Sequence, residues 1–350
     1  MEKQKINARI VADSIDPRGN RITTFVLTYP RIIHAEVMTH RLFSRNAASS
    51  RAIPFKTMVK SVEDDPFIPI AWQKDHKGMQ GTKYIVDPIE IKNCIKQWLF
   101  ARDEAVNHSE NLHGDYYIYD GTDIPLQMGV TKQLCNRLLE PFQWYTCLVT
   151  TTELENFYKL RCPQYTNGYD EEFRSRKDYI NGTSEPEMYP TSEVGWWSIS
   201  KSGAEIHIQA LAEAMWDAQN ESKPKLLSDG EWHIPFGDKF DHSELRKLEE
   251  ALNTKDRTKL AISIATARCA RLSYMTFDGE IDYEKDIQLH DQLLESGHAS
   301  PFEHCCRVLN EEEYNTLGKM TLHPEKGYIF EKGWVDNIQG FISYRRILNI

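Results

Sequence analysis

The strongest structural signal in this 350-residue chain is a run of β-branched and aromatic residues, Arg21–Tyr29, which stops at Pro30. A second apolar, β-rich stretch covers residues 142–152. Elsewhere the apolar residues recur at helical spacing, as they do over residues 89–111. Strands and amphipathic helices within one chain predict an α/β (α+β) fold, in which helices pack on a sheet.

Helical patterns continue along the chain and are interrupted by less regular segments. Helices are expected over residues 32–42, 134–139, 153–160, 204–217, 260–274 and 283–296. Residues 162–203 are rich in Pro, Gly, Tyr, Ser and alternating charges and lack periodicity, which predicts a long loop or insertion. Residues 53–120 are mixed and polar apart from the helix at 89–111, and we interpret them as a second insertion.

One short segment, Thr39–Arg51, concentrates cationic and hydroxyl side chains and contains no acidic residue. Its arginines are Arg41, Arg45 and Arg51. Guanidinium forks together with hydroxyl and backbone N–H donors are the groups that bind phosphate. The segment is therefore a candidate anion site, although a solvated basic turn would have the same composition.

The overall charge limits the classes of partner. A net charge of −10 argues against a nucleic-acid-binding protein, because such proteins need a basic field. The first residues contain no apolar stretch that could act as a signal peptide, and no later run approaches membrane-spanning length. The seven cysteines form no CxxC pair. We expect a protein with reduced thiols in the cytoplasm (the host cytoplasm if it is phage-encoded), with no membrane partner.

Four segments carry a resemblance to the flavin-dependent thymidylate synthases (ThyX). His40-Arg41, seven residues and then Ser49-Ser50-Arg51 resembles the family signature, in which Arg-His-Arg precedes seven residues and Ser. Residues 136–161 resemble the helical region that closes with Leu-Arg, and residues 204–212 are similar to the helix that follows it. Residues 267–304, which end in His-Ala-Ser-Pro-Phe-Glu-His, resemble the amino-terminal block of the family.

The order of these segments is rotated. The His-x-Ser-Pro-Phe-Glu-His block comes first in the family but lies near the carboxyl end here, whereas the strand and signature open this chain. A circular permutation explains this order, and permutation is tolerated when the termini lie close together on the surface. The resemblance thus implies one catalytic unit over residues 1–350 with an antiparallel or mixed sheet. Its parts are the strand and signature (1–52), an insertion (53–120), a helical catalytic region (121–220, interrupted by 162–203) and the permuted block (255–350).

The resemblance also implies an activity. It is the reductive methylation of dUMP to dTMP by an FAD-dependent methyltransferase, with methylenetetrahydrofolate as the carbon donor and NADPH as the reductant. The family builds its sites between the subunits of a homotetramer, so an oligomer with shared sites is expected. In the alternatives, a related enzyme modifies another pyrimidine nucleotide, for example by hydroxymethylation of dUMP or dCMP, or an inactive relative only binds nucleotide.

The residues that match the family motifs take their roles from the resemblance. The catalytic residue is Arg161; the dUMP-binding residues are Glu36, Thr39, Arg45, Ser49, Ser50, Arg51, Arg137 and Arg161; the flavin-binding residues are His40, Arg41, Asn156, His298 and Ser300. The sequence departs from the family where Thr39 replaces the first Arg, where Ala47 replaces a Glu, and where Glu36 stands in place of the common Gln. Arg45 is a candidate for the missing positive charge.

Each assignment has a plainer structural alternative. Arg161 could be a surface arginine that packs its stem, and Arg137 could be the partner in a helix salt bridge. His298 and Ser300 could cap a turn, and Asn156 could simply be solvated. No metal is expected.

A zinc site and a cysteine nucleophile are the rival chemistries. His298, His304, Cys305 and Cys306 include zinc-ligand types, but adjacent cysteines point in different directions and no second pair stands at ligand spacing. A cysteine nucleophile would need an activating base, and nothing in the sequence singles out one of the seven cysteines for that role.

Overall fold

A five-stranded sheet organises the computed structural model, which describes residues 3–78, 81–114, 129–183, 189–254, 256–272 and 282–350. The strand order is β3-β4-β2-β1-β7. The bounds are β1 Asn7–Ile15, β2 Arg21–Pro30, β3 Ser44–Ala47, β4 Trp144–Thr151 and β7 Lys225–Leu226. All neighbours pair antiparallel except β1 and β7, which are parallel. The strands expected over residues 21–29 and 142–152 are confirmed as β2 and β4, and so is the α/β fold class.

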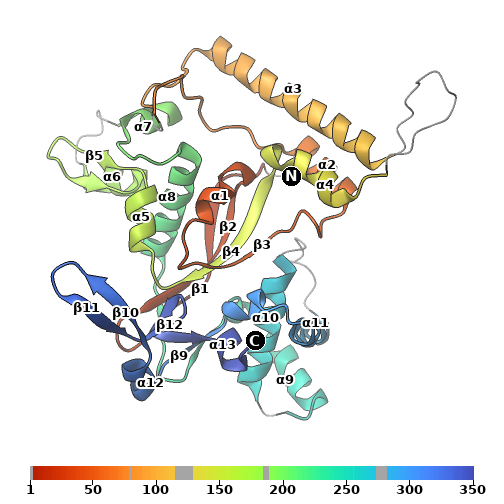
Figure 1. The fold of residues 1–350 in the computed structure, drawn as a ribbon, viewed down its shortest axis with the longest axis vertical. Coiled ribbons are helices and arrows are strands. Elements are labelled where there is room, and N and C mark those ends of the chain that lie inside the picture. The colour runs from red at the N-terminus through yellow and green to blue at the C-terminus, as the bar shows by residue number, and fades with distance from the viewer. Residues whose placement is uncertain (1–2, 79–80, 115–128, 184–188, 255, 273–281) are drawn as a thin grey trace.

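Alternate side chains of the sheet build two cores. Phe25 and Val149 face α5 (Glu155–Arg161) and α8 (Ile206–Glu221), whereas Val26 and Leu148 face α10 (Arg257–Arg271). Figure 1 shows these helices on opposite sides of the sheet. Both faces of the sheet are thus covered, in a three-layer arrangement. No helix within the described ranges is long and apolar enough to cross a bilayer.

The segment between β3 and β4 is mainly helical. It contains α2 (Phe55–Asp64), α3 (Pro88–His113), α4 (Lys132–Leu138) and the 3-10 turn η2 (Glu140–Phe142). The carboxylate of Asp87 caps α3 by accepting hydrogen bonds from the N–H groups of Ile89 and Glu90. The helices expected at 89–111 and 134–139 are confirmed as α3 and α4.

Two expectations about local structure are wrong. Of the two alternatives for residues 162–203, the long loop is wrong and the insertion stays a prediction: they contain β5 (Tyr165–Thr166), β6 (Glu172–Phe173), α6 (Arg176–Gly182) and α7 (Glu193–Ile199). Tyr165, Tyr179 and Trp196 form a separate aromatic core there. The helix expected at 32–42 is shorter, with η1 at Arg31–Ile33 and α1 at His34–Val37. The Arg45 guanidinium contacts carbonyls at the end of α1, where the chain turns away.

The carboxyl-terminal half surrounds the other face of the sheet. Its helices are α9 (His242–Ala251), α11 (Tyr283–Glu295), α12 (Glu311–Thr316) and α13 (Tyr344–Leu348), with the 3-10 turns η4 (Gly237–Lys239) and η6 (Ser300–Glu303). Its strands are β8 (Trp232–His233), β9 (Cys306–Val308), β10 (Gly318–His323), β11 (Gly327–Lys332), β12 (Trp334–Val335), β13 (Ile338–Gln339) and β14 (Phe341–Ser343). β14, β9 and β8 form a small second sheet. The helices expected at 204–217, 260–274 and 283–296 correspond to α8, α10 and α11, although residues 273–274 lie outside the described residues.

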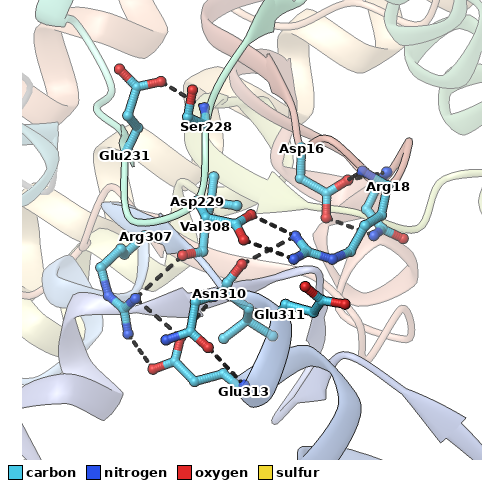
Figure 2. Close-up of polar contacts among 12 residues, drawn as sticks. Asp16, Arg18, Ser228, Asp229, Glu231, Arg307, Val308, Asn310, Glu311 and Glu313 are labelled. Carbon is cyan, nitrogen blue, oxygen red and sulfur yellow. Dashed lines mark hydrogen bonds and ion pairs between the residues drawn. The ribbon is translucent and has the colours of Figure 1, made fainter.

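Charged contacts fasten the β1–β2 turn to this half (Figure 2). Arg18 donates from both terminal nitrogens to the Asp229 carboxylate, at 2.7 and 2.9 Å, and from Nη1 to the Leu309 carbonyl. Below it, Arg307 forms a second bidentate pair with Glu313. Bidentate geometry fixes orientation as well as distance. The turn near the start of the chain is thereby held against segments that lie some 200 to 300 residues later in the sequence.

Candidate active site

Arg161 lies at the carboxyl end of α5 and reaches toward α1. Its Nη1 donates to Glu36 Oε2 at 3.2 Å, and both side chains are partly buried. Phe157 and Tyr158 anchor α5 in the core beneath the sheet, which leaves Arg161 at the open end of the helix. A cation is favoured there because the helix dipole is negative at its carboxyl end.

His40 joins the same cluster. Its ring stands edge-on to Phe157, with centroids 4.6 Å apart, and also contacts Phe43. Burial, reinforced by the charges of Arg161 and Arg45, lowers the pKa of His40 to about 4. The imidazole is therefore neutral near pH 7. Among the described residues its Nε2 has no hydrogen-bond partner although it is buried.

Arg45 shapes the turn that carries the signature residues. Its Nη1 donates to the carbonyls of Met38 (3.0 Å) and His40 (3.3 Å). Thr39 is also used locally, because its hydroxyl donates to the Glu36 carbonyl at 2.6 Å. Arg41, by contrast, is exposed. The structure thus brings Glu36, His40, Arg45 and Arg161 together, with Thr39 and Arg41 on the adjoining turn.

Glu205 and His207, at the start of α8, adjoin this cluster and are absent from the predicted set. Glu205 accepts hydrogen bonds from the backbone N–H and ring Nδ1 of His207, at 2.8 and 2.5 Å. Burial, together with the charge of Glu205, raises the pKa of Glu36, while Arg161 and His207 oppose the shift. The available sequence signal was an acid in N-cap position before an apolar helix, inside the family-like segment 204–212.

A second group of predicted residues follows β3. The Asn136 amide is buried and donates to the carbonyls of Ser50 (2.8 Å) and Ile53 (3.2 Å), which fastens this turn to α4. Ser49 Oγ accepts from the Arg51 N–H at 3.3 Å. Arg51 is exposed, and so is Arg137 on α4. This turn and helix present hydroxyl and guanidinium groups at the surface.

The permuted block lies against β3, the strand within the signature segment Thr39–Arg51. Ser300 Oγ donates to Asn46 Oδ1 at 3.5 Å, and the Asn46 amide donates to the Cys269 carbonyl at 2.5 Å. Ser300 and Asn46 are 254 residues apart in the sequence. The carboxyl-terminal block therefore lies against β3 of the opening segment. His298, just before this turn, is exposed, as is Asn156 on α5.

Strand alternation separates two of these groups. Arg45 pairs with Val149, which faces α5 and α8, whereas the next residue, Asn46, pairs with Leu148, which faces α10. Ser300 and Arg161 therefore approach β3 from opposite faces. One chain does not gather all the predicted residues on a single surface.

Four buried cysteines, Cys147, Cys162, Cys305 and Cys306, are unsuited to nucleophilic chemistry in this state. Burial raises the pKa of Cys147 and of Cys305 to about 12, and it also raises the pKa of Cys162 and Cys306. His304 Nδ1 is hydrogen-bonded to Thr150, at 2.8 Å. Within the described part of the chain, no group of three or more His, Cys, Asp or Glu side chains is arranged to hold a metal.

A cavity of about 1010 Å³ lies beside α6, α7 and α8, and none of the predicted site residues lines it. Glu213 and Arg176 form part of its wall. Burial raises the pKa of Glu213 to about 7, against the opposing charge of Arg176. Volume alone would favour this cavity as the active site, but the clustered signature residues lie elsewhere.

Comparison with known proteins gives distant structural neighbours. No protein-family model matches the chain, and no curated protein matches it. The crystal structure of a UMP/dUMP methylase, PolB from Streptomyces cacaoi, bound with 5-Br UMP is 15% identical in sequence. The structural match covers 63% of this chain and 90% of the methylase chain, with a TM-score of 0.40. The same methylase bound with 5-Br dUMP is 13% identical and covers 49% and 84%, with a TM-score of 0.35.

Proposed function

We propose that this protein is a flavin-dependent thymidylate synthase that converts dUMP to dTMP, built on a permuted chain. The observation that carries the proposal is the contact between Ser300 and Asn46. It brings the family-like carboxyl-terminal block against β3, within the signature segment. Sequence order alone does not require that contact.

The chemistry of the Arg161 cluster supports the assignment. Alkylation at C5 of a uracil ring needs negative charge to build up on the ring, and a guanidinium held against the carbonyl and N3 would stabilise that charge. Glu36 engages one terminal nitrogen of Arg161, and among the described residues Arg161 Nε is buried without a hydrogen-bond partner. Arg161 would therefore polarise the ring while Glu36 orients the fork. The buried cysteines Cys147, Cys162, Cys305 and Cys306, with raised pKa values, would take no part.

The residues present also fit a flavin. His40, Arg41, Asn156, His298 and Ser300 would hold it, because they supply ring, guanidinium, amide and hydroxyl groups. When bound, reduced FAD would supply the hydride and mediate transfer of the carbon unit from methylenetetrahydrofolate, with NADPH as the reductant. The phosphate of dUMP would bind at the turn with Ser49, Ser50 and Arg51 and at Arg137 on α4.

The positions of Arg161 and Ser300 on opposite faces of β3 support a site shared between subunits. Arg161 and Ser300 approach this strand from opposite faces, so a site that uses both needs surfaces from different subunits. We therefore propose an oligomer with sites between subunits, and from the family resemblance we propose that it is a homotetramer in the cytoplasm.

A single assay series tests the function. Purified protein supplied with FAD, NADPH, methylenetetrahydrofolate and dUMP should bind flavin, release deuterium from C5-labelled dUMP and yield a product with the mass of dTMP. A hydroxymethylated product, or turnover of dCMP instead, would replace the proposed reaction by another pyrimidine modification. A colourless protein that takes up no FAD on titration would contradict the flavin enzyme and leave a nucleotide-binding relative.

A further inference from the structure

A series of hydrogen bonds runs across strands β2 and β4 and includes two buried histidines, His233 and His304. It joins Ser14 Oγ to His233 Nδ1 (2.9 Å), His233 Nε2 to Thr24 Oγ1 (2.8 Å), Thr24 Oγ1 to Thr150 Oγ1 (2.7 Å), and Thr150 Oγ1 to His304 Nδ1 (2.8 Å). All five side chains are at most 5% exposed. Thr24 and Thr150 face each other directly across β2 and β4. The hydrogen-bond series therefore lies on the face of the sheet that is covered by α10.

Each side chain in this hydrogen-bond series can donate a fixed number of protons. Burial lowers the pKa of His233 to about 4 and that of His304 to about 3, so both rings are neutral near pH 7. A neutral imidazole has one N–H and one lone pair, and a threonine hydroxyl has one proton to donate. Every bond in the chain needs one donor and one acceptor, so the direction of one bond determines the direction of the others.

Only two arrangements satisfy all the bonds. If Thr24 donates to Thr150, its oxygen must accept from His233 Nε2–H, and Thr150 must donate to His304 Nδ1. Both histidines then carry their proton on Nε2. If Thr150 donates to Thr24, every direction reverses and both histidines carry their proton on Nδ1. The two rings, which do not touch, therefore share one tautomer.

The ends of the chain favour the second arrangement. Among the described residues, His304 Nε2 is buried without a hydrogen-bond partner, and a buried N–H is less often left unpaired than a buried acceptor. A bare lone pair at Nε2 puts the proton on Nδ1. At the other end, Ser14 then accepts from His233 and turns its own proton toward a cavity of about 690 Å³, which it lines.

We propose that these five residues form a two-state relay that couples the wall of this cavity at Ser14 to the turn that carries Ser300. A hydrogen-bond acceptor in the cavity, such as water or a ligand carbonyl, holds the Nδ1–H state by accepting from Ser14. A donor there favours the Nε2–H state. His304 directly follows η6, which contains Ser300, so the hydrogen-bonding character of the ring beside that turn changes with the occupant of the cavity.

The change of state conserves protons. On passing from the Nε2–H to the Nδ1–H state, each of the five groups gives one proton and receives one. Ser14 takes its replacement proton from water, and the Nε2 proton of His304 passes to water, so the net charge of the five groups is unchanged. No electrons move and no bond between heavy atoms changes. The proposal is independent of the thymidylate synthase assignment, because it concerns only residues of this chain and water.

Tautomers measured by NMR test the relay at pH 7. In protein labelled with ¹⁵N-histidine, two-bond ¹H–¹⁵N correlations should show His233 and His304 both protonated at Nδ1. Ser14→Ala removes the acceptor from His233 Nδ1–H and should shift both rings toward Nε2–H together, although Ser14 does not contact His304. Different tautomers in the unmodified protein, or a change at His233 alone, would overturn the proposal.

A cut in the chain supplies the control. Thr150→Val removes the hydroxyl that joins Thr24 to His304, so adding Ser14→Ala in that background should shift the tautomer of His233 and leave that of His304 unchanged. Thr146→Val, on the same face of β4 but outside the chain, should preserve the joint response. If Thr150→Val does not fold, the spectra of the unmodified protein and of Ser14→Ala still decide the outcome.

Discussion

Replacement of Arg161 should separate catalysis from stability. Its partner Glu36 is 34% exposed, and the pair is joined by one nitrogen at 3.2 Å. After solvent screening such a pair contributes less than about 1 kcal/mol to the free energy of unfolding. Loss of a donor that stabilises transition-state charge costs about a hundredfold or more in kcat, roughly 2.7 kcal/mol. Arg161→Ala and Arg161→Lys should therefore fold, bind FAD and turn over slowly, since lysine lacks the planar fork.

The assay has an internal structural check. Arg161 is one of the two charges that depress the pKa of His40, so Arg161→Ala should raise that pKa in an NMR titration. Lys159→Ala, exposed on the same helix, serves as the matched control and should retain turnover. If Arg161→Lys keeps full kcat while Cys147→Ala is folded, yellow and inactive, the reasoning is wrong and the reaction runs through a thiolate.

Further predictions address the phosphate, the subunits and the pH dependence. Arg51→Ala should raise the Kd for dUMP about tenfold by calorimetry, because a charge-assisted bond is lost; an unchanged Kd would remove this turn from the site. Mixing Arg161→Ala with Ser300→Ala subunits should give more turnover than either variant alone if sites are shared, whereas a site within one chain would give no gain. Burial raises the folded-state pKa of Glu213 to about 7, above its ordinary 4.5, so its ionisation destabilises the protein as the pH rises through this interval. In urea unfolding, Glu213→Gln should remove a pH dependence of at most about 3 kcal/mol, and Glu250→Gln should not.

The periodic helices could be predicted from sequence because packing reinforces their local pattern. The apolar stripe of residues 89–111 became α3, and that of residues 283–296 became α11, each displaced by no more than one or two residues at an end. Such stripes are long enough to show periodicity and are buried on one side. The same holds for β2, whose β-branched run lies at the centre of the sheet.

Short elements could not be predicted because their local sequence carries no clear periodicity. Helices α6 and α7 begin at the serine caps Ser175 and Ser192 and are too short to show a clear periodicity. Their stability comes from aromatic rings of residues 165–197 that pack edge to face, as Tyr179 does on Trp196 at 5.6 Å. A window over the sequence sees only a polar segment rich in glycine and proline, because the contacts that order it are tertiary.

The candidate site shows the same limit at the level of single residues. The motifs indicated a permuted chain, and in the structure Ser300 of the carboxyl-terminal block contacts Asn46 of β3. They did not predict that Arg45 would bind the backbone carbonyls of Met38 and His40. A motif specifies which residue types occur, whereas the number of free donors depends on the local turn. Thr39 stands where the family signature has its first arginine. Arg45 is therefore a weaker candidate than Arg51 for supplying the positive charge of that arginine.

The two-residue period of β3 has the largest consequence for function. Adjacent residues of a strand point to opposite faces, so Arg45 sits with the Arg161 cluster and Asn46 sits with Ser300. A shift of register by one residue would exchange these environments, and seven core side chains of β2 and β4 hold the register because they alternate between two apolar layers. The separation of the two groups is thus built into the sheet and is not a matter of side-chain rotamers. In the proposed shared site a second subunit would supply the missing surface, which is why the mixed-subunit experiment tests that site more directly than any single substitution.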